Sequence, residues 1–148
     1  MMHMAGRVAD TVSMIPRQTT GEWSVADSVP DSTMAAMSEK AAWVRAGAAD
    51  VGRDPDAIEL NTMVAKTIIG DQPEAAIARE AADAGLTVAE LADSTLYLCG
   101  TSEDVCQRLG QWRDEAGISY VSLFDPGEEQ IAYLAEQVIP ALVGPARP

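Results

Sequence analysis

The sequence predicts an α/β fold, and three apolar segments indicate it. Residues 11–15, 58–69 and 118–124 are rich in β-branched and other apolar side chains, which is typical of buried strands. Stretches with helical periodicity separate them, and each connection is long enough for a crossover between parallel strands. We therefore expect three neighbouring parallel strands in that order, buried on both faces and covered by helices 33–51 and 102–116.

The first of these strands follows a short helix. The stretch MMHMAGRVADTVSMIP begins with apolar residues at helical spacing, continues as a β-type run, and stops at Pro16. Residues 16–32 are rich in Gly, Pro, Ser, Thr and Asp and predict a loop. The helix over 33–51 carries an apolar stripe at three-and-four spacing, and Gly52 ends it.

Helix signals divide the rest of the chain. We expect helices over residues 73–84, 87–92, 102–116 and 128–142, with a short extended piece at 95–100. Pro73 suits a first helical position, and Thr87 with Glu90 forms a capping box. Gly117 ends the 102–116 helix, and Pro140 should bend or break the last one.

Composition bounds the class of protein. The chain has 148 residues, enough for a single domain spanning 1–148, and a net charge of −13 at pH 7. That charge argues against nucleic acid and anionic membrane surfaces as partners. No apolar run approaches the length of a membrane helix, and the N-terminal stretch does not have a secretory signal's uninterrupted apolar region. We therefore expect a cytoplasmic protein.

No catalytic or metal constellation can be drawn from the residues alone. The acidic residues are scattered rather than grouped at ligand spacing, so no metal site is predicted. Cys99 and Cys106 lack Cys-x-x-Cys spacing, and the only histidine, His3, gives a Cys–His pair no support. Glycine-rich nucleotide turns, the P-loop, G-x-S-x-G and H-E-x-x-H are all absent from the sequence. We assign no catalytic residue.

Four stretches resemble the C-terminal part of luciferase-like flavin-dependent oxidoreductases, particularly the branch that uses the deazaflavin coenzyme F-420. MMHMAGRVADTVSMIP is similar to a helix of the form Met-x-x-x-Ala-x-x-x-Ala-Asp followed by barrel strand six. SEKAAWVRAGAADV resembles a Glu-Lys-x-x-Trp-Val-Arg helix, and IELNTMVAKTII resembles strand seven. GTSEDVCQRLGQWRDEAGISYVSLFD resembles a Gly-Thr-x-Glu-x-Val helix and strand eight.

The resemblance implies the C-terminal part of a (β/α)8 TIM barrel, strands six to eight with their helices. In that family a glycine-rich turn before the first of these helices helps to hold the cofactor phosphate, and here it would fall before Met1. The implied chemistry is hydride transfer between a flavin or deazaflavin, FMN or coenzyme F-420, and a small organic substrate, or flavin-dependent oxygenation. The family's catalytic residues on its first strands have no counterpart here, so we expect the chain alone to be inactive and to bind FMN or coenzyme F-420 weakly at best.

Barrel active sites lie at the C-terminal ends of the strands, so the implied cofactor-binding residues are Pro16, Arg17 and Lys66. Arg17 suits an anionic cofactor tail, but it is equally compatible with a solvated loop position. For Lys66, a lysine that reaches solvent from a strand end is favoured over a ligand contact. A partial barrel would leave apolar edges unpaired, so we expect either a homo-oligomer or pairing with an N-terminal half. The alternatives are a non-catalytic, self-associating structural or interaction module and a small α/β enzyme of unrelated chemistry.

Overall fold

The computed structural model describes residues 1–17 and 24–143. The helices are α1 (Met2–Val8), α2 (Val25–Ser28), α3 (Met34–Ala49), α4 (Glu74–Asp83), α5 (Val88–Asp93), α6 (Ser102–Ala116), α7 (Glu128–Tyr133) and α8 (Ile139–Val143), with 3-10 turns at Val29–Asp31 and Pro55–Ala57 and a π-helical turn at Leu134–Val138. The strands are β1 (Thr11–Ser13), β2 (Glu59–Val64), β3 (Lys66–Ile69), β4 (Tyr97–Gly100) and β5 (Ile118–Leu123).

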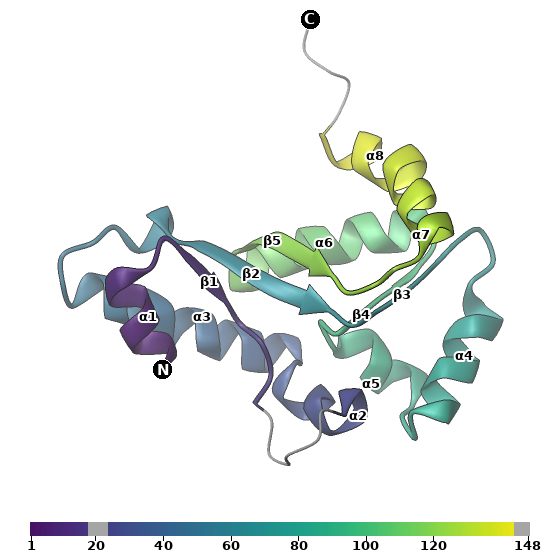
Figure 1. The fold of residues 1–148 in the computed structure, drawn as a ribbon, viewed down its shortest axis with the longest axis horizontal. Helices are drawn as coiled ribbons and strands as arrows, with labels where there is room; N and C mark the ends of the chain where they lie inside the picture. Colours follow the sequence, from purple (N-terminus) through teal and green to yellow (C-terminus); the bar gives the residue numbers. More distant parts are fainter. Residues whose placement is uncertain (18–23, 144–148) are drawn as a thin grey trace, which may run out of the picture.

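Three strands form a parallel sheet in the order β1-β2-β5 (Figure 1). This confirms the predicted neighbours, their order and their direction. The register is irregular between Leu60 and Asn61, because Leu60 pairs with Ile118 while Asn61 pairs with Tyr120. Ser119 therefore has no partner on β2 and forms a bulge in β5.

The prediction of one strand over residues 58–69 is wrong. β2 ends at Val64, and the backbone N–H groups of Ala65 and Lys66 then donate to the Leu96 carbonyl, at 2.8 and 3.0 Å. Those hydrogen bonds move the chain away from β5, and β3 pairs in parallel with β4 in a second, two-stranded sheet. The short extended piece expected at 95–100 is this partner strand, β4.

The expected loop over residues 16–32 also contains helix. Residues 18–23 lie outside the described part, but α2 and a 3-10 turn follow them. The Ser24 hydroxyl accepts a hydrogen bond from the Asp27 N–H at 3.3 Å and so caps α2. Small polar residues are typical of loops, but Ser24 in this segment caps a helix instead.

One face of the three-stranded sheet is covered by α3 and α6, which lie behind it in Figure 1. The predicted positions of both helices are confirmed. The Thr33 side chain caps α3 by accepting a hydrogen bond from the Ala36 N–H, and Gly117 ends α6 with a φ of 73°. The side chains buried between sheet and helices form the main core, which includes Met14, Met37, Val44, Leu60, Val64, Val105 and Trp112.

Helix α1 packs closely on α3 through two glycines. A Cβ on Gly6 would lie 1.9 Å from the Val44 carbonyl oxygen, and one on Gly47 would lie 1.9 Å from the His3 carbonyl oxygen. Arg53 then holds the C-terminal end of α1, because its guanidinium donates to the Gly6 and Ala9 carbonyls at 3.1 and 2.8 Å. A cation at this end of a helix also complements its dipole.

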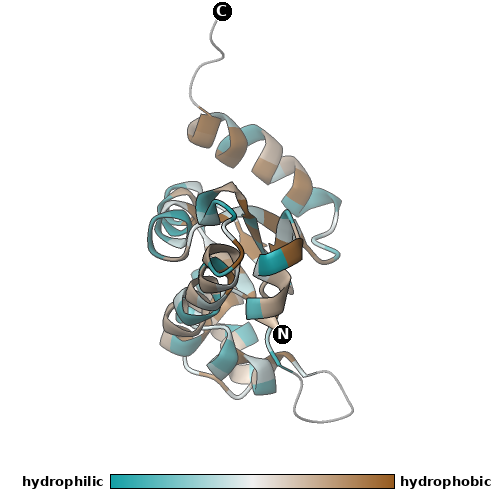
Figure 2. Ribbon diagram, turned by 90° about the vertical axis from the view of Figure 1, so that its left-hand side faces the viewer, coloured by the Kyte–Doolittle hydropathy of each residue, from teal (hydrophilic) through white to brown (hydrophobic). Residues whose placement is uncertain are grey.

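The C-terminal helix runs through α7, the π-helical turn and α8 and stands away from the body (Figure 2). The Ile139 N–H bonds to the Leu134 carbonyl, five residues back, instead of four. We expected Pro140 either to bend or to break this helix. The helix is not broken at Pro140, and the π-helical turn lies just before this residue. No helix in the described residues is long and apolar enough to cross a membrane.

Candidate functional site

The predicted rim lies where the parallel strands end. Ile15 and Arg17 follow β1, Lys66 follows β2, and Phe124 follows β5, so these residues come after the carboxyl ends of neighbouring strands. Pro16 is buried, whereas the Arg17 side chain is 77% exposed. The rim therefore presents one solvent-exposed guanidinium at the end of β1.

Lys66 is engaged elsewhere. Its ammonium lies 3.6 Å from the Glu80 carboxylate on α4, and its backbone opens β3 in the second sheet. Arg17 is instead near Asp31, with its Nε 4.0 Å from a carboxylate oxygen. Each of the two predicted cations thus has its own carboxylate, and among the described contacts none joins them into one anion site.

Lys40 is a rim residue that the sequence reasoning missed. Its side chain on α3 is only 4% exposed, and its ammonium donates to the Asp31 carboxylate at 2.9 Å and to the Ile15 carbonyl at 3.4 Å. The signal was present: the buried stripe of α3 contains Met37 and Ala41, so position 40 falls on the same face. A lysine there needed a buried partner.

Asp31 joins this lysine to the chain after β1. Its carboxylate accepts from the Arg17 backbone N–H at 2.6 Å as well as from Lys40. Burial raises the pKa of Asp31, but the hydrogen bonds from the Arg17 N–H and Lys40 and the charges of Lys40 and Arg17 together outweigh it, so the pKa is lowered. Lys40 and Asp31 therefore fix where the segment after β1 leaves the sheet.

The face of the sheet opposite α3 and α6 carries polar groups from every strand. We call it the open face; its side chains are Thr11, Ser13, Ile15, Glu59, Asn61, Met63, Tyr120, Ser122 and Phe124. Ser13 donates to the Asn61 carboxamide oxygen at 2.7 Å, and the Asn61 amide donates to the Tyr120 carbonyl and the Ser122 hydroxyl, both at 3.1 Å. Asn61 thus binds the backbone where the bulge interrupts the ladder.

The expectation that the strands are buried on both faces is wrong for this open face. Ile15, Tyr120 and Phe124 are 51%, 48% and 61% exposed. The sequence ISYVSLF is apolar enough for a buried strand, but only Ile118, Val121 and Leu123 reach the core. The chain covers one face of its sheet, and it leaves aromatic side chains exposed on the other.

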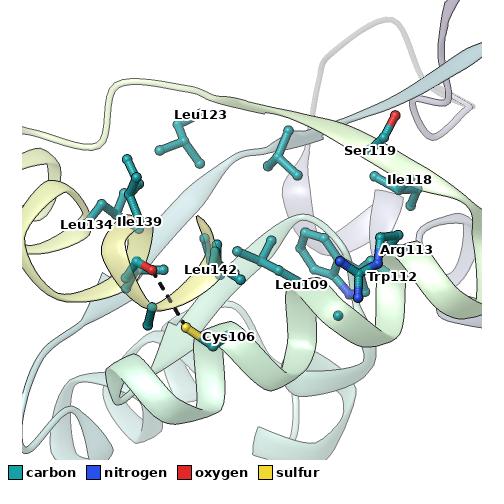
Figure 3. A pocket seen from close by; sticks show the side chains of 15 residues that line it. Cys106, Leu109, Trp112, Arg113, Ile118, Ser119, Leu123, Leu134, Ile139 and Leu142 are labelled. Atoms are coloured by element: carbon teal, nitrogen blue, oxygen red, sulfur yellow. Dashed lines mark hydrogen bonds between the residues drawn. The ribbon is translucent and has the colours of Figure 1, made fainter. Parts of the chain in front are cut away.

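A hollow lies on the covered side of the sheet. It is an apolar cleft of about 540 Å³ between α6, β5 and the C-terminal helix (Figure 3). Leu109 and Trp112 line it from α6, Leu123 from β5, and Leu134 and Leu142 from the C-terminal helix. None of Pro16, Arg17 and Lys66 lines it, so it is separate from the predicted cofactor site.

The two cysteines give no reactive site. Cys99 is buried, and burial raises the pKa of its thiol, which disfavours the nucleophilic thiolate. Cys106 is half-buried and lies 3.9 Å from the Val138 carbonyl. His3 pairs with Asp50 at 3.0 Å. In residues 1–17 and 24–143 no group of three or more His, Cys, Asp or Glu side chains could hold a metal ion.

Comparison with known proteins identifies the fold. No family model matches the chain, and no curated protein matches it by sequence. Solved structures do match: riboflavin lyase with modified FMN and riboflavin (16% identity, TM-score 0.64), EDTA monooxygenase from Chelativorans sp. BNC1 (15%, 0.63) and the coenzyme F-420-dependent tetrahydromethanopterin reductase of Methanopyrus kandleri (15%, 0.61). The match covers 96% of this chain in each case and 40%, 43% and 48% of those chains.

The described fold is similar to part of the fold of these luciferase-like enzymes. The resemblance noted in the sequence is therefore confirmed at the level of the fold. This chain spans less than half the length of the structures it matches. The region that this chain matches belongs to TIM-barrel enzymes.

Proposed function

We propose that this chain is the C-terminal portion of a luciferase-like oxidoreductase, and that it contributes strands six to eight of the barrel. The observation that carries the proposal is the open face. Helices cover one face of the three-stranded parallel sheet, whereas Tyr120 and Phe124 are exposed on the other face. Further parallel strands would bury that face, as barrel strands bury each other.

The proposed cofactor is FMN or coenzyme F-420, with a small organic substrate. One matching structure contains modified FMN, and another is described as coenzyme F-420-dependent. The residues at the rim suit such a group in part: Arg17 offers an exposed cation for an anionic tail, and Phe124 offers an apolar surface for a flat ring. When bound, a flavin or deazaflavin supplies the hydride chemistry.

The chain's own contribution is binding and orientation. Arg17 would hold the cofactor's anionic end, and the buried Pro16 would restrict the backbone just before it. Lys40 with Asp31 would keep that segment at a fixed place beside β1. Lys66 would contribute less, because Glu80 already partners it. The open face would exclude water once covered. We assign no catalytic residue to this chain and propose that it is inactive alone.

Fluorescence titration with FMN and coenzyme F-420 tests the proposal. The chain alone should bind weakly, because an exposed cation at an open rim contributes little in water. The chain joined to an amino-terminal barrel portion should bind tightly. Arg17→Ala should then weaken binding, whereas Arg7→Ala should not, because Arg7 is also exposed but lies in α1, before β1. Tight binding by the chain alone would contradict the proposal.

A second candidate function is that of a non-catalytic, self-associating module. Among the described residues, no strand pairs with the outer edge of β1 or of β5. Unpaired strand edges favour association with another chain. In this role the open face would serve as a contact surface rather than as a cofactor site, and the titration above would detect no cofactor binding in either form.

A further inference from the structure

The Tyr97 side chain is fully buried, yet its hydroxyl has no hydrogen-bond partner among the described residues. Tyr97 opens β4 and belongs to a second buried cluster that also contains Ala81 from α4 and Leu91 from α5. A buried polar group without a partner lowers the stability of a fold. Because the described residues already enclose this side chain completely, an acceptor for its hydroxyl has to come from a side chain beside it.

Glu80 on α4 is the acidic side chain that acts on this hydroxyl. Lys66 and Tyr97 are partners in the parallel ladder of β3 and β4, so their side chains lie on the same face of the second sheet. On that face the Lys66 ammonium reaches the Glu80 carboxylate. Burial, and next the charge of Glu80, raise the pKa of Tyr97 to about 12. The hydroxyl therefore keeps its proton at neutral pH and can donate it to a carboxylate.

The ion pair between Lys66 and Glu80 is loose. Its nitrogen and oxygen are 3.6 Å apart, which is longer than a hydrogen bond, and the Lys66 side chain is 54% exposed. An ion pair of this kind contributes little in water. A hydrogen bond from a buried hydroxyl to a carboxylate is stronger, but the carboxylate loses part of its hydration when it turns inward. These effects oppose each other, so Glu80 has two partners of comparable value.

We propose that the Glu80 carboxylate alternates between the Lys66 ammonium and the Tyr97 hydroxyl, and that this exchange controls whether Lys66 is available to an anionic group at the rim. When Glu80 accepts from Tyr97, the buried hydroxyl is satisfied and the Lys66 ammonium no longer has a carboxylate beside it. An anion that binds Lys66 favours this arrangement. Glu80 and Tyr97 are thus positioning residues for Lys66. The role of Lys66 rests on the proposed function, whereas the exchange itself does not.

A thermodynamic cycle in the full chain, without cofactor, tests the exchange. In a Lys66→Met background, Glu80 has only the Tyr97 hydroxyl as a partner. Tyr97→Phe should there raise the equilibrium constant for unfolding about tenfold, because it removes a hydrogen bond to a charged group. In the natural sequence the same substitution should raise this constant by less than about twofold, because Glu80 is paired with Lys66. Urea denaturation of the four proteins gives both ratios.

Two further variants are the controls for this cycle. Lys66→Arg keeps a cation beside Glu80, so Tyr97→Phe should behave in that background as it does in the natural sequence. Tyr133→Phe removes a hydroxyl that donates to Asp71 at 3.0 Å, and its effect should be the same with Lys66 and with Lys66→Met. An equal effect of Tyr97→Phe in the natural and Lys66→Met backgrounds would overturn the exchange.

Titration with FMN and coenzyme F-420, in the chain joined to an amino-terminal barrel portion, tests the effect on Lys66. Glu80→Gln should tighten binding about threefold, because it removes the carboxylate that competes for the ammonium. Adding Lys66→Met should abolish this gain. Asp83→Asn is the matched control, since it removes the same charge from an exposed position on α4, and it should change binding by less than about 1.5-fold.

The outcomes separate this inference from the proposed function. Unchanged binding in Glu80→Gln, or equal tightening by Glu80→Gln and Asp83→Asn, would overturn the control of Lys66 by Glu80. Binding of neither cofactor by the joined protein would instead contradict the proposed function. The cycle without cofactor decides the exchange in either case.

Discussion

The two faces of the three-stranded sheet differ in polarity and in burial. The face toward α3 and α6 is apolar and closely packed, and Met14, Val44 and Trp112 are almost fully buried there. The open face has a hydrogen-bonded row from Ser13 through Asn61 to Ser122, flanked by exposed aromatic rings. The first face accounts for the stability of the fold, and the second leaves large side chains exposed.

The strongest test of this comparison removes one side chain from each face. Leu60→Ala should lower the free energy of unfolding by about 2–5 kcal/mol, because it leaves a cavity in the covered core. Phe124→Ala should change it by less than about 0.5 kcal/mol, because Phe124 is 61% exposed. Urea denaturation of both variants measures the difference. A large loss in Phe124→Ala would mean that the open face is already covered in solution.

A second pair of variants examines how tightly the covered side is built. Gly47→Ala should destabilise the fold by about 1–3 kcal/mol, since its Cβ would meet the His3 carbonyl at 1.9 Å. Gly110→Ala, in the interior of α6 with nothing within 4 Å of the added Cβ, should stabilise it by about 0.5–1 kcal/mol. Thermal unfolding reports both. The same sign for the two substitutions would contradict the close α1–α3 contact.

A smaller effect than those of Leu60→Ala and Gly47→Ala comes from Asp31, at the border between the two faces. Because the folded protein lowers the pKa of Asp31 below its ordinary value of 3.8, the carboxylate stabilises the fold fully above that pH. The stabilisation is lost as pH falls through the lowered pKa. Asp31→Asn should therefore cost about 1 kcal/mol at neutral pH and nothing under acid conditions. Unfolding curves of both proteins against pH should converge at low pH; parallel curves would mean that Asp31 is not held by Lys40.

Local sequence signals predicted most of the helices and strands. They did not predict where β2 ends or that one face of the sheet is exposed. Caps and stop signals at Thr33, Thr87, Thr101 and Gly117 are short-range, and the structure places helix ends at all of them. The split after Val64 depends on the Leu96 carbonyl, more than thirty residues away along the chain, and no local pattern encodes it.

The candidate site was predicted less well for the same reason. Arg17 could be placed at the end of β1 from the strand alone. The ion pair of Lys40 with Asp31 forms only when α3 and the 3-10 turn at Val29–Asp31 come together. The partner of Lys66 is Glu80 on α4, which also depends on tertiary contacts. Cofactor binding by Pro16, Arg17 and Lys66 stays a prediction.

The π-helical turn at Leu134–Val138 sets the rotational phase of everything that follows it. An α-helix advances about 100° per residue, so a turn with one extra residue rotates the later side chains by roughly that angle. Ile139 and Leu142 face the cleft in this phase. Deleting a single residue within the turn would return it to regular α-helix and keep these two side chains at the cleft, whereas winding the same residues as an uninterrupted α-helix would swing both off it, so the orientation of the last helix depends on the length of this turn as much as on the residues in it.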